Sequence, residues 1–228
     1  MSVTPPSCEN LRRQVVFSRI ARGGTPLKGE IMSSKDYNAP LWDTAEELNR
    51  NECFNDLAYR NMTFDRDDRP EHILSKAARA YAENFQPALE QHGIMFTGNV
   101  GTGKTFYACC IANAVIDRGC TAWVTTFQPL VRALCSYEAA EKILAKIRKV
   151  DLLVLDDLGS TALNDFTTDK IFEIVDERYR SGKPLIVTTN LNPDEAWKSS
   201  IGMRRIFDRL RERCRHVVVD GESRRRAC

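Results

Sequence analysis

The chain has 228 residues, of which 43% are hydrophobic and 28% are charged, and its formal net charge is +2. These values are those of an ordinary soluble protein, and they exclude binding to nucleic acid through overall charge, so any DNA contact needs a local patch. No apolar run approaches about 18 residues and no signal-peptide pattern is present, which excludes an ordinary membrane span and predicts a cytoplasmic protein without a membrane partner.

The first part of the chain differs in composition from the rest. Stretches such as RGGTPLKG and MSSKDYNAP are typical of loops. One amphipathic stripe is formed by Leu11, Val15, Val16 and Ile20. It either binds a partner or docks on the domain that follows. We predict a short N-terminal appendage, residues 1–56, that binds a partner or is partly disordered, and a main domain, residues 57–228.

The sequence GNVGTGKT, Gly98–Thr105, has the spacing of a phosphate-binding loop, or Walker A motif. An apolar strand at 93–97 precedes it and a helix that ends near Gly119 follows, which a chance glycine-rich turn would lack. Lys104 would reach the β- and γ-phosphates of ATP, and Thr105 would place its hydroxyl on Mg²⁺. The predicted nucleotide contacts are Gly98, Asn99, Val100, Gly101, Thr102, Gly103, Lys104, Thr105 and Phe106.

Helices and strands alternate along the main domain. A helix is expected within 71–85, and further helices are expected from Pro129, over 138–149, from Asp169 to about Gly182, from Pro193 and over 203–214. The expected strands are 93–97, 121–127, 151–157, 185–190 and 216–220. This alternation predicts an α/β fold of the P-loop NTPase type, with a five-stranded parallel sheet and helices on both faces.

Two carboxylates follow the apolar run of the strand at 151–157. Ligands bind at the carboxyl ends of parallel strands, so Asp156 is the candidate to hold Mg²⁺ through its water shell. Asp157 could orient the attacking water, and Asn190, at the end of the next strand, could touch the γ-phosphate or that water. The alternatives are a solvated turn for the two acids and a capping or loop role for Asn190.

Two arginines share one face of the helix MRRIFDRLRERC. Arg205 and Arg209 are four residues apart, beside an apolar stripe that docks the helix on the core. Guanidinium groups held in this way suit the charge of a γ-phosphate in a neighbouring subunit's site. The alternative is surface ion pairing with Asp208 and Glu212.

The ordered motifs resemble the AAA+ ATPases and, within them, the DnaC-type replicative helicase loaders of the phage and Gram-positive branch. The matching stretches are ECFNDLAYRNMTFDRDDR, GNVGTGKTF, LLVLDDLG, RYRSGKPLIVTTNL, RRIFDRLRERC and GESRR. The resemblance implies an ATPase that binds ATP and Mg²⁺, self-associates with shared ATP sites, and places a replicative DNA helicase on single-stranded DNA. It also implies that Asn190 is sensor 1, Arg209 the arginine finger and Arg205 a second basic residue, and that Thr63 and Phe64 approach the adenine.

The chain departs from the AAA+ pattern at two points. Asp157 stands where AAA+ proteins generally have Glu, so we expect weak hydrolysis that is stimulated by assembly and suits a switch. About twenty residues follow Asp208, too few for a full lid domain, so no sensor 2 arginine is assigned.

A local basic patch is the candidate DNA contact. It consists of Lys142, Lys146, Arg148 and Lys149, with Trp123 and Phe127 as residues on which bases could stack. A solvated basic face and a buried Trp123 are the alternatives. For the whole protein, an IstB-type transposition helper ATPase acting on duplex DNA is the main alternative to a helicase loader, and a nucleotide-dependent kinase is a third.

Overall fold

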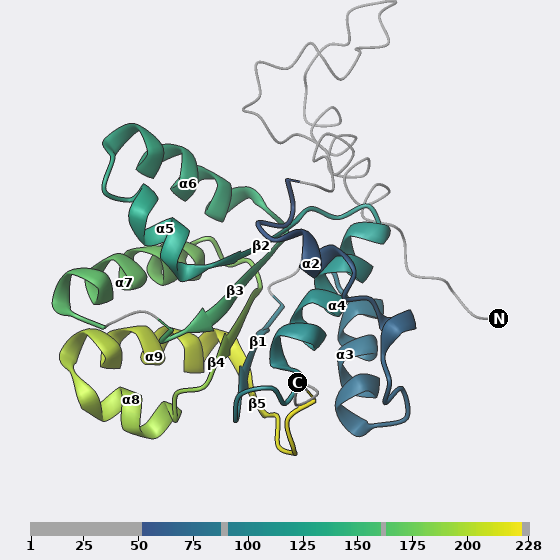
Figure 1. Ribbon diagram of the computed structural model, residues 1–228. Helices are drawn as coiled ribbons and strands as arrows, with labels where there is room; N and C mark the ends of the chain where they lie inside the picture. The colour runs from purple at the N-terminus through teal and green to yellow at the C-terminus, as the bar shows by residue number, and fades with distance from the viewer. Residues whose placement is uncertain (1–51, 88–90, 161–162, 225–228) are drawn as a thin grey trace, which may run out of the picture.

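A five-stranded sheet forms the centre of the protein. The structure is a computed structural model that describes residues 52–87, 91–160 and 163–224. The strand order is β2-β3-β4-β1-β5, and every neighbouring pair is parallel (Figure 1). The strands are β1 (Gly93–Thr97), β2 (Ala122–Thr126), β3 (Leu152–Leu158), β4 (Leu185–Thr189) and β5 (Cys214–Val218). The predicted five-stranded parallel sheet is confirmed.

Helices cover both faces of this sheet, as predicted. One face carries α2 (Leu57–Arg60), the 3-10 helix η1 (Phe64–Arg66), α3 (Ile73–Glu83) and α4 (Lys104–Asp117). The other carries α5 (Phe127–Ala133), α6 (Tyr137–Lys149), α7 (Asp165–Arg180), α8 (Pro193–Ser199) and α9 (Ile201–Arg213) (Figure 1). Side chains alternate along each strand, so Ile94 and Phe96 join one apolar cluster and Met95 joins the other.

Several element boundaries differ from the predicted ones. Helix α7 begins at Asp165 rather than Asp169, because the Asn164 side chain accepts a hydrogen bond from Thr167 N and caps the helix. Strand β5 begins at Cys214 rather than residue 216, directly after α9, because pairing with β1 extends it. A side-chain cap and a strand pairing therefore account for the differences between the predicted and the observed boundaries.

The segment before α2 lies along the edge of β2. Phe54 forms a parallel bridge with Val124, whose N–H donates to Cys53 O at 2.7 Å. Cys53 and Phe54 are buried in the core cluster. The division at residue 56 remains a prediction, because residues 1–51, including the stripe from Leu11 to Ile20, lie outside the described part of the chain.

The chain after β5 runs to Arg224, the last described residue, with no further helix in that stretch. None of the described helices is both long and apolar enough to cross a membrane.

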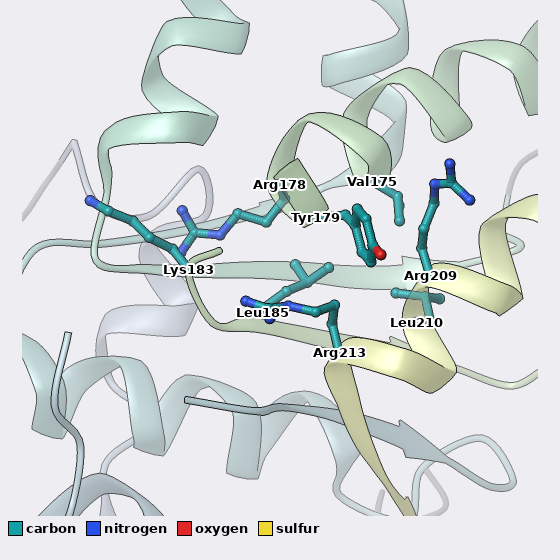
Figure 2. A pocket seen from close by; sticks show the side chains of 8 residues that line it. All are labelled: Val175, Arg178, Tyr179, Lys183, Leu185, Arg209, Leu210 and Arg213. Carbon is teal, nitrogen blue, oxygen red and sulfur yellow. The ribbon is translucent and has the colours of Figure 1, made fainter. Parts of the chain in front are cut away.

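Arg178 is a fully buried cation that joins three parts of the fold. Its side chain extends from the C-terminal end of α7 (Figure 2). The guanidinium donates to Pro184 O at 2.7 and 3.2 Å, Ile147 O at 2.7 Å, Val150 O at 2.8 Å and Asp151 O at 2.9 Å. Burial lowers the pKa of Arg178 to about 9, so the group stays charged at neutral pH. It ties the end of α6 to the starts of β3 and β4.

Arg178→Met should lower the free energy of unfolding by about 3–5 kcal/mol, because four buried carbonyl groups lose their donor. Urea unfolding followed by circular dichroism measures the change. The matched control is Arg180→Met on the same helix, whose side chain is 73% exposed and pairs with Asp176. It should cost at most about 1 kcal/mol. Equal losses in the two variants would show that the buried network does not hold the fold.

Candidate nucleotide-binding site

The loop between β1 and α4 folds around the ammonium group of Lys104. Gly98, Gly101 and Gly103 have φ values of 135°, 84° and 106°, the left-handed region that favours glycine. Lys104 Nζ donates to Gly98 O at 2.8 Å and to Asn99 O at 2.6 Å. The structure therefore brings the predicted phosphate-loop residues into one compact turn at the start of α4.

Asp156 is the centre of a cluster of hydroxyl groups. Its Oδ1 accepts hydrogen bonds from Thr105 Oγ1 at 2.8 Å and Thr188 Oγ1 at 2.5 Å. Its Oδ2 accepts one from Tyr59 at 2.9 Å. Burial and the neighbouring Asp156 raise the pKa of Tyr59 far above its usual value, so its hydroxyl remains a donor.

Thr105 and Asp156 fit the predicted magnesium site. Both offer oxygen, the ligand that Mg²⁺ prefers, and they lie in direct contact. The three hydroxyl donors to Asp156 are neutral, so its negative charge is solvated by hydrogen bonds without being cancelled by them. A hydroxyl of the loop beside a buried carboxylate is the arrangement that would hold Mg²⁺ directly and through its bound water.

Asp157 lies beside this cluster, and Asn190 lies beside the phosphate loop. Asp157 has φ 61°, and its N–H donates to Thr188 Oγ1 at 2.9 Å, so its backbone turns away from the strand path. Asn190 is exposed and lines a cavity of about 550 Å³ together with Gly98 and Asn99. The structure thus places Asn190 beside the phosphate loop, and its contact with a γ-phosphate remains a prediction.

The same cavity contains residues that the sequence did not single out. Arg211 of α9 lines it and pairs with Asp194 at 2.5 Å, and His216 of β5 shares a hydrogen bond with Thr97 Oγ1 at 2.7 Å. The sequence shows several arginines in the stretch RLRER but does not show which of them lies near the phosphate loop. The packing of α8 against α9 places Arg211 there.

Arg205 and Arg209 lie on the face between α7 and α9 and do not line this cavity. Arg209 Nε donates to Asp176 Oδ1 at 2.6 Å, and the Arg205 guanidinium lies 3.8 Å from the centroid of the Phe172 ring. Figure 2 shows Arg209 projecting from α9 toward α7.

The two acids that the sequence offered as ion-pair partners for these arginines accept hydrogen bonds from neutral side chains. Asp208 accepts a hydrogen bond from Trp197, and Glu212 accepts one from Tyr179. The arginine-finger role remains a prediction.

Arginines lie against two of the predicted nucleotide contacts, Phe64 beside the adenine and Phe106 after the phosphate loop. Arg79 donates to Phe64 O at 2.7 Å and lies 4.7 Å from its ring centroid. Arg224 lies 5.1 Å from the ring centroid of Phe106, and its backbone N–H donates to Gly101 O at 2.8 Å. Thr63, the residue before η1, makes no side-chain cap. Arg224 lies in the matching stretch GESRR, but the sequence assigned it no contact because no local pattern indicates that this stretch meets the loop.

The basic patch on α6 differs from the prediction. Trp123 and Phe127 are 3% and 1% exposed, so neither can stack on a base, because their rings pack in the core. Lys146 lies 4.1 Å from the Trp123 ring centroid, and burial lowers its pKa.

The remaining cations of this patch are divided between solvent and ion pairs. Arg148 pairs with Glu177 at 2.9 Å and with Glu141 at 3.6 Å, whereas Lys142 is exposed. DNA binding by α6 stays a prediction, without its aromatic part.

Comparison with known proteins identifies the family and agrees with the fold. Residues 43–227 match the family described as IstB-like ATP binding protein. The replicative helicase loader DnaC of Escherichia coli strain K12 is 34% identical over 143 residues, which are 60% of the chain and 56% of that protein. The chain thus matches little more than half the length of this relative.

Solved structures show the same arrangement. The crystal structure of the DnaC helicase loader superposes with a TM-score of 0.60 and 25% identity, covering 72% of this chain and 100% of that one. AMPPCP-bound DnaA from Aquifex aeolicus gives a TM-score of 0.57 and 20% identity, covering 70% of this chain and 50% of that one, which supports the AAA+ fold alone.

Gly98→Ala should lower the free energy of unfolding by about 3 kcal/mol, because an added Cβ combines a strained φ with a backbone clash. That Cβ would lie 2.3 Å from Val219 O, and Val219 is held by a hydrogen bond from its N–H to Thr97 O. Gly119→Ala is the matched control, since Gly119 has φ 79° and nothing within 4 Å of an added Cβ. It should cost only about 1–2 kcal/mol. Thermal and urea unfolding compare the two. Equal costs would mean that the Val219 contact imposes no constraint.

Proposed function

The chain belongs to the IstB-like ATP-binding protein family, and on that premise we propose that it is a cytoplasmic ATPase that loads a replicative helicase onto single-stranded DNA. ATP binding and slow hydrolysis would act as a switch for assembly. The observation that carries the proposal is the contact between Thr105 of the phosphate loop and the buried Asp156. Similarity to a replicative helicase loader supports the choice of partner.

The residues of the site divide the work of binding ATP. Backbone N–H groups of the loop, with the N-terminus of α4 behind them, would bind the phosphates. Lys104, which bonds to two loop carbonyls, would exchange them for phosphate oxygens. Thr105 and Asp156 would hold Mg²⁺ directly and through water. The ion would neutralise charge on the β- and γ-phosphates.

Hydrolysis is proposed to be slow. Asp157 would orient the attacking water, but its side chain is one methylene shorter than the Glu that AAA+ proteins generally carry there. Its backbone is further fixed by φ 61° and the hydrogen bond to Thr188. A carboxylate held short of the water would activate it weakly, which suits a protein that changes state once per loading event.

A transposition helper that acts on duplex DNA is the second candidate. The family match covers most of the chain, and the family is described as IstB-like ATP binding protein. The same ATP-binding core is therefore compatible with a helicase loader and with a transposition helper. The strand preference of DNA binding separates them.

In the loading test, immobilised protein is mixed with the host or phage replicative helicase and with fluorescent single-stranded or duplex DNA. We expect ATP to increase capture of the helicase and of single-stranded DNA by at least about tenfold, a difference of about 1.4 kcal/mol. Lys104→Ala should lose the ATP effect, because the ammonium that neutralises the phosphates is gone.

Two results would contradict this outcome. Equal capture with and without ATP would overturn the switch, and preference for duplex DNA without helicase would favour the transposition helper. Unchanged ATP affinity of Lys104→Ala in a nucleotide titration would overturn the loop assignment itself.

Arg209→Ala tests whether ATP sites are shared between subunits. The variant should bind ATP normally, because its own loop is intact, while hydrolysis falls by up to about 10³-fold, the lower end for arginine fingers. Mixed with Lys104→Ala, which has no working loop but an intact Arg209, it should recover part of the activity.

Arg180→Ala is the control for the ion pair. Arg180 also pairs with Asp176, so this variant removes a partner of the same carboxylate without removing Arg209. It should hydrolyse ATP at the parent rate. Parent-level activity in Arg209→Ala, or no recovery in mixtures that do co-assemble, would argue against a shared site.

A further inference from the structure

Tyr59 contacts the candidate metal ligand from outside the sheet and the phosphate loop. Of the three hydroxyl groups bonded to Asp156, Thr105 belongs to α4 and Thr188 to β4, both parts of the core. Tyr59 belongs to the four-residue helix α2, which precedes that core. The Tyr59 hydroxyl donates to Oδ2 of Asp156, whereas both threonines donate to Oδ1.

The segment that carries Tyr59 is fixed at both of its ends. Asn113, a buried residue of α4, donates from Nδ2 to Tyr59 O and Met62 O, each at 3.0 Å. At the other end, Asn55 N donates to Val124 O at 3.1 Å, and Asn55 Nδ2 donates to Thr125 Oγ1 at 2.6 Å. Residues 53–62 therefore run from the edge of β2 to the phosphate-loop helix and pass Asp156 on the way.

The carboxylate of Asp156 has little freedom left. A carboxylate has about four lone-pair positions, and hydrogen bonds from hydroxyl groups occupy three of them. The two bonds to Oδ1 fix that oxygen, and the bond from Tyr59 fixes the rotation of the group about it. The remaining lone pair lies on Oδ2 and has one direction in which it can accept a hydrogen bond from metal-bound water.

We propose that Tyr59 is a positioning residue that orients Asp156 for Mg²⁺ and couples metal-bound nucleotide to the segment 53–62. The inference rests on the proposed ATP site and names a residue that lies outside both the phosphate loop and strand β3. Coupling between two sites is reciprocal, so metal binding that tightens the Tyr59 bond also holds this segment, and a partner that moves the segment weakens the metal site.

Tyr59→Phe removes one hydroxyl group and keeps the ring. Affinity for a fluorescent ATP analogue is measured on the full chain, with Mg²⁺ and with EDTA. We expect unchanged affinity in EDTA and about tenfold weaker affinity with Mg²⁺, the size of one hydrogen bond to a charged group. A structural defect would weaken both. Tyr81→Phe is the matched control. Tyr81 lies on α3, away from the site, and its hydroxyl donates to His92 O at 3.1 Å. It should leave both affinities unchanged.

Hydrogen exchange gives a second readout that does not depend on activity. In the parent, ATP with Mg²⁺ should slow exchange at the backbone N–H groups of Tyr59, Asn61 and Met62, which bond within the segment. In Tyr59→Phe the same addition should leave their exchange rates unchanged.

Each outcome has a distinct meaning. Equal or tighter Mg²⁺-dependent affinity in Tyr59→Phe, or the same protection in both proteins, would overturn the positioning role and leave the proposed function standing. A parent protein that binds no nucleotide would overturn the proposed function, and the inference with it. A parent that binds nucleotide without any effect of Mg²⁺ would overturn the metal site and the role of Tyr59, but not nucleotide binding.

Discussion

The buried carboxylate of Asp156 is the constraint around which the site is arranged. A buried charge needs hydrogen-bond donors, and this one obtains them from α2, α4 and β4. The strand order places β3 beside β4 and β4 beside β1, so Asp156, Thr188 and the phosphate loop share one edge of the sheet. Sheet order and the solvation of one carboxylate thus determine which side chains surround the nucleotide.

The fold was predictable because its signals are local. Apolar runs bounded by polar residues identified all five strands, and Pro193 correctly marked the start of α8, where Asn192 accepts a hydrogen bond from Asp194 N. The boundaries that were wrong depend on partners elsewhere. Cys214 is a strand residue because it pairs with Gly93, across more than a hundred residues of sequence, and nothing beside Cys214 indicates this.

The site was predictable only where a motif carries its own geometry. The glycines and Lys104 of the loop could be read from their spacing. Tyr59 lies 97 residues from Asp156, and nothing in the matching stretch ECFNDLAYRNMTFDRDDR indicates which residue it contacts. Arg178 was hidden for a different reason. An arginine on an amphipathic helix is normally read as a surface residue, and only the meeting of α6, β3 and β4 provides the carbonyl groups that bury it. Burial of Trp123 likewise removed the predicted stacking surface.

The segments before and after the core both contact the candidate site. Before the core, Tyr59 reaches Asp156, and after β5, Arg224 bonds to Gly101 O and pairs with Asp67 and Asp68, which lie between α2 and α3. Arg224 therefore joins the segment after the core to the segment before it across the start of α4. Within residues 219–224 no helix follows β5, so Arg224 makes the described contact between that stretch and the start of α4. Under the proposed function, a loop that moves on nucleotide binding would act on Arg224 through Gly101, and a metal ion at Asp156 would act on Tyr59, so each segment has its own contact with the site.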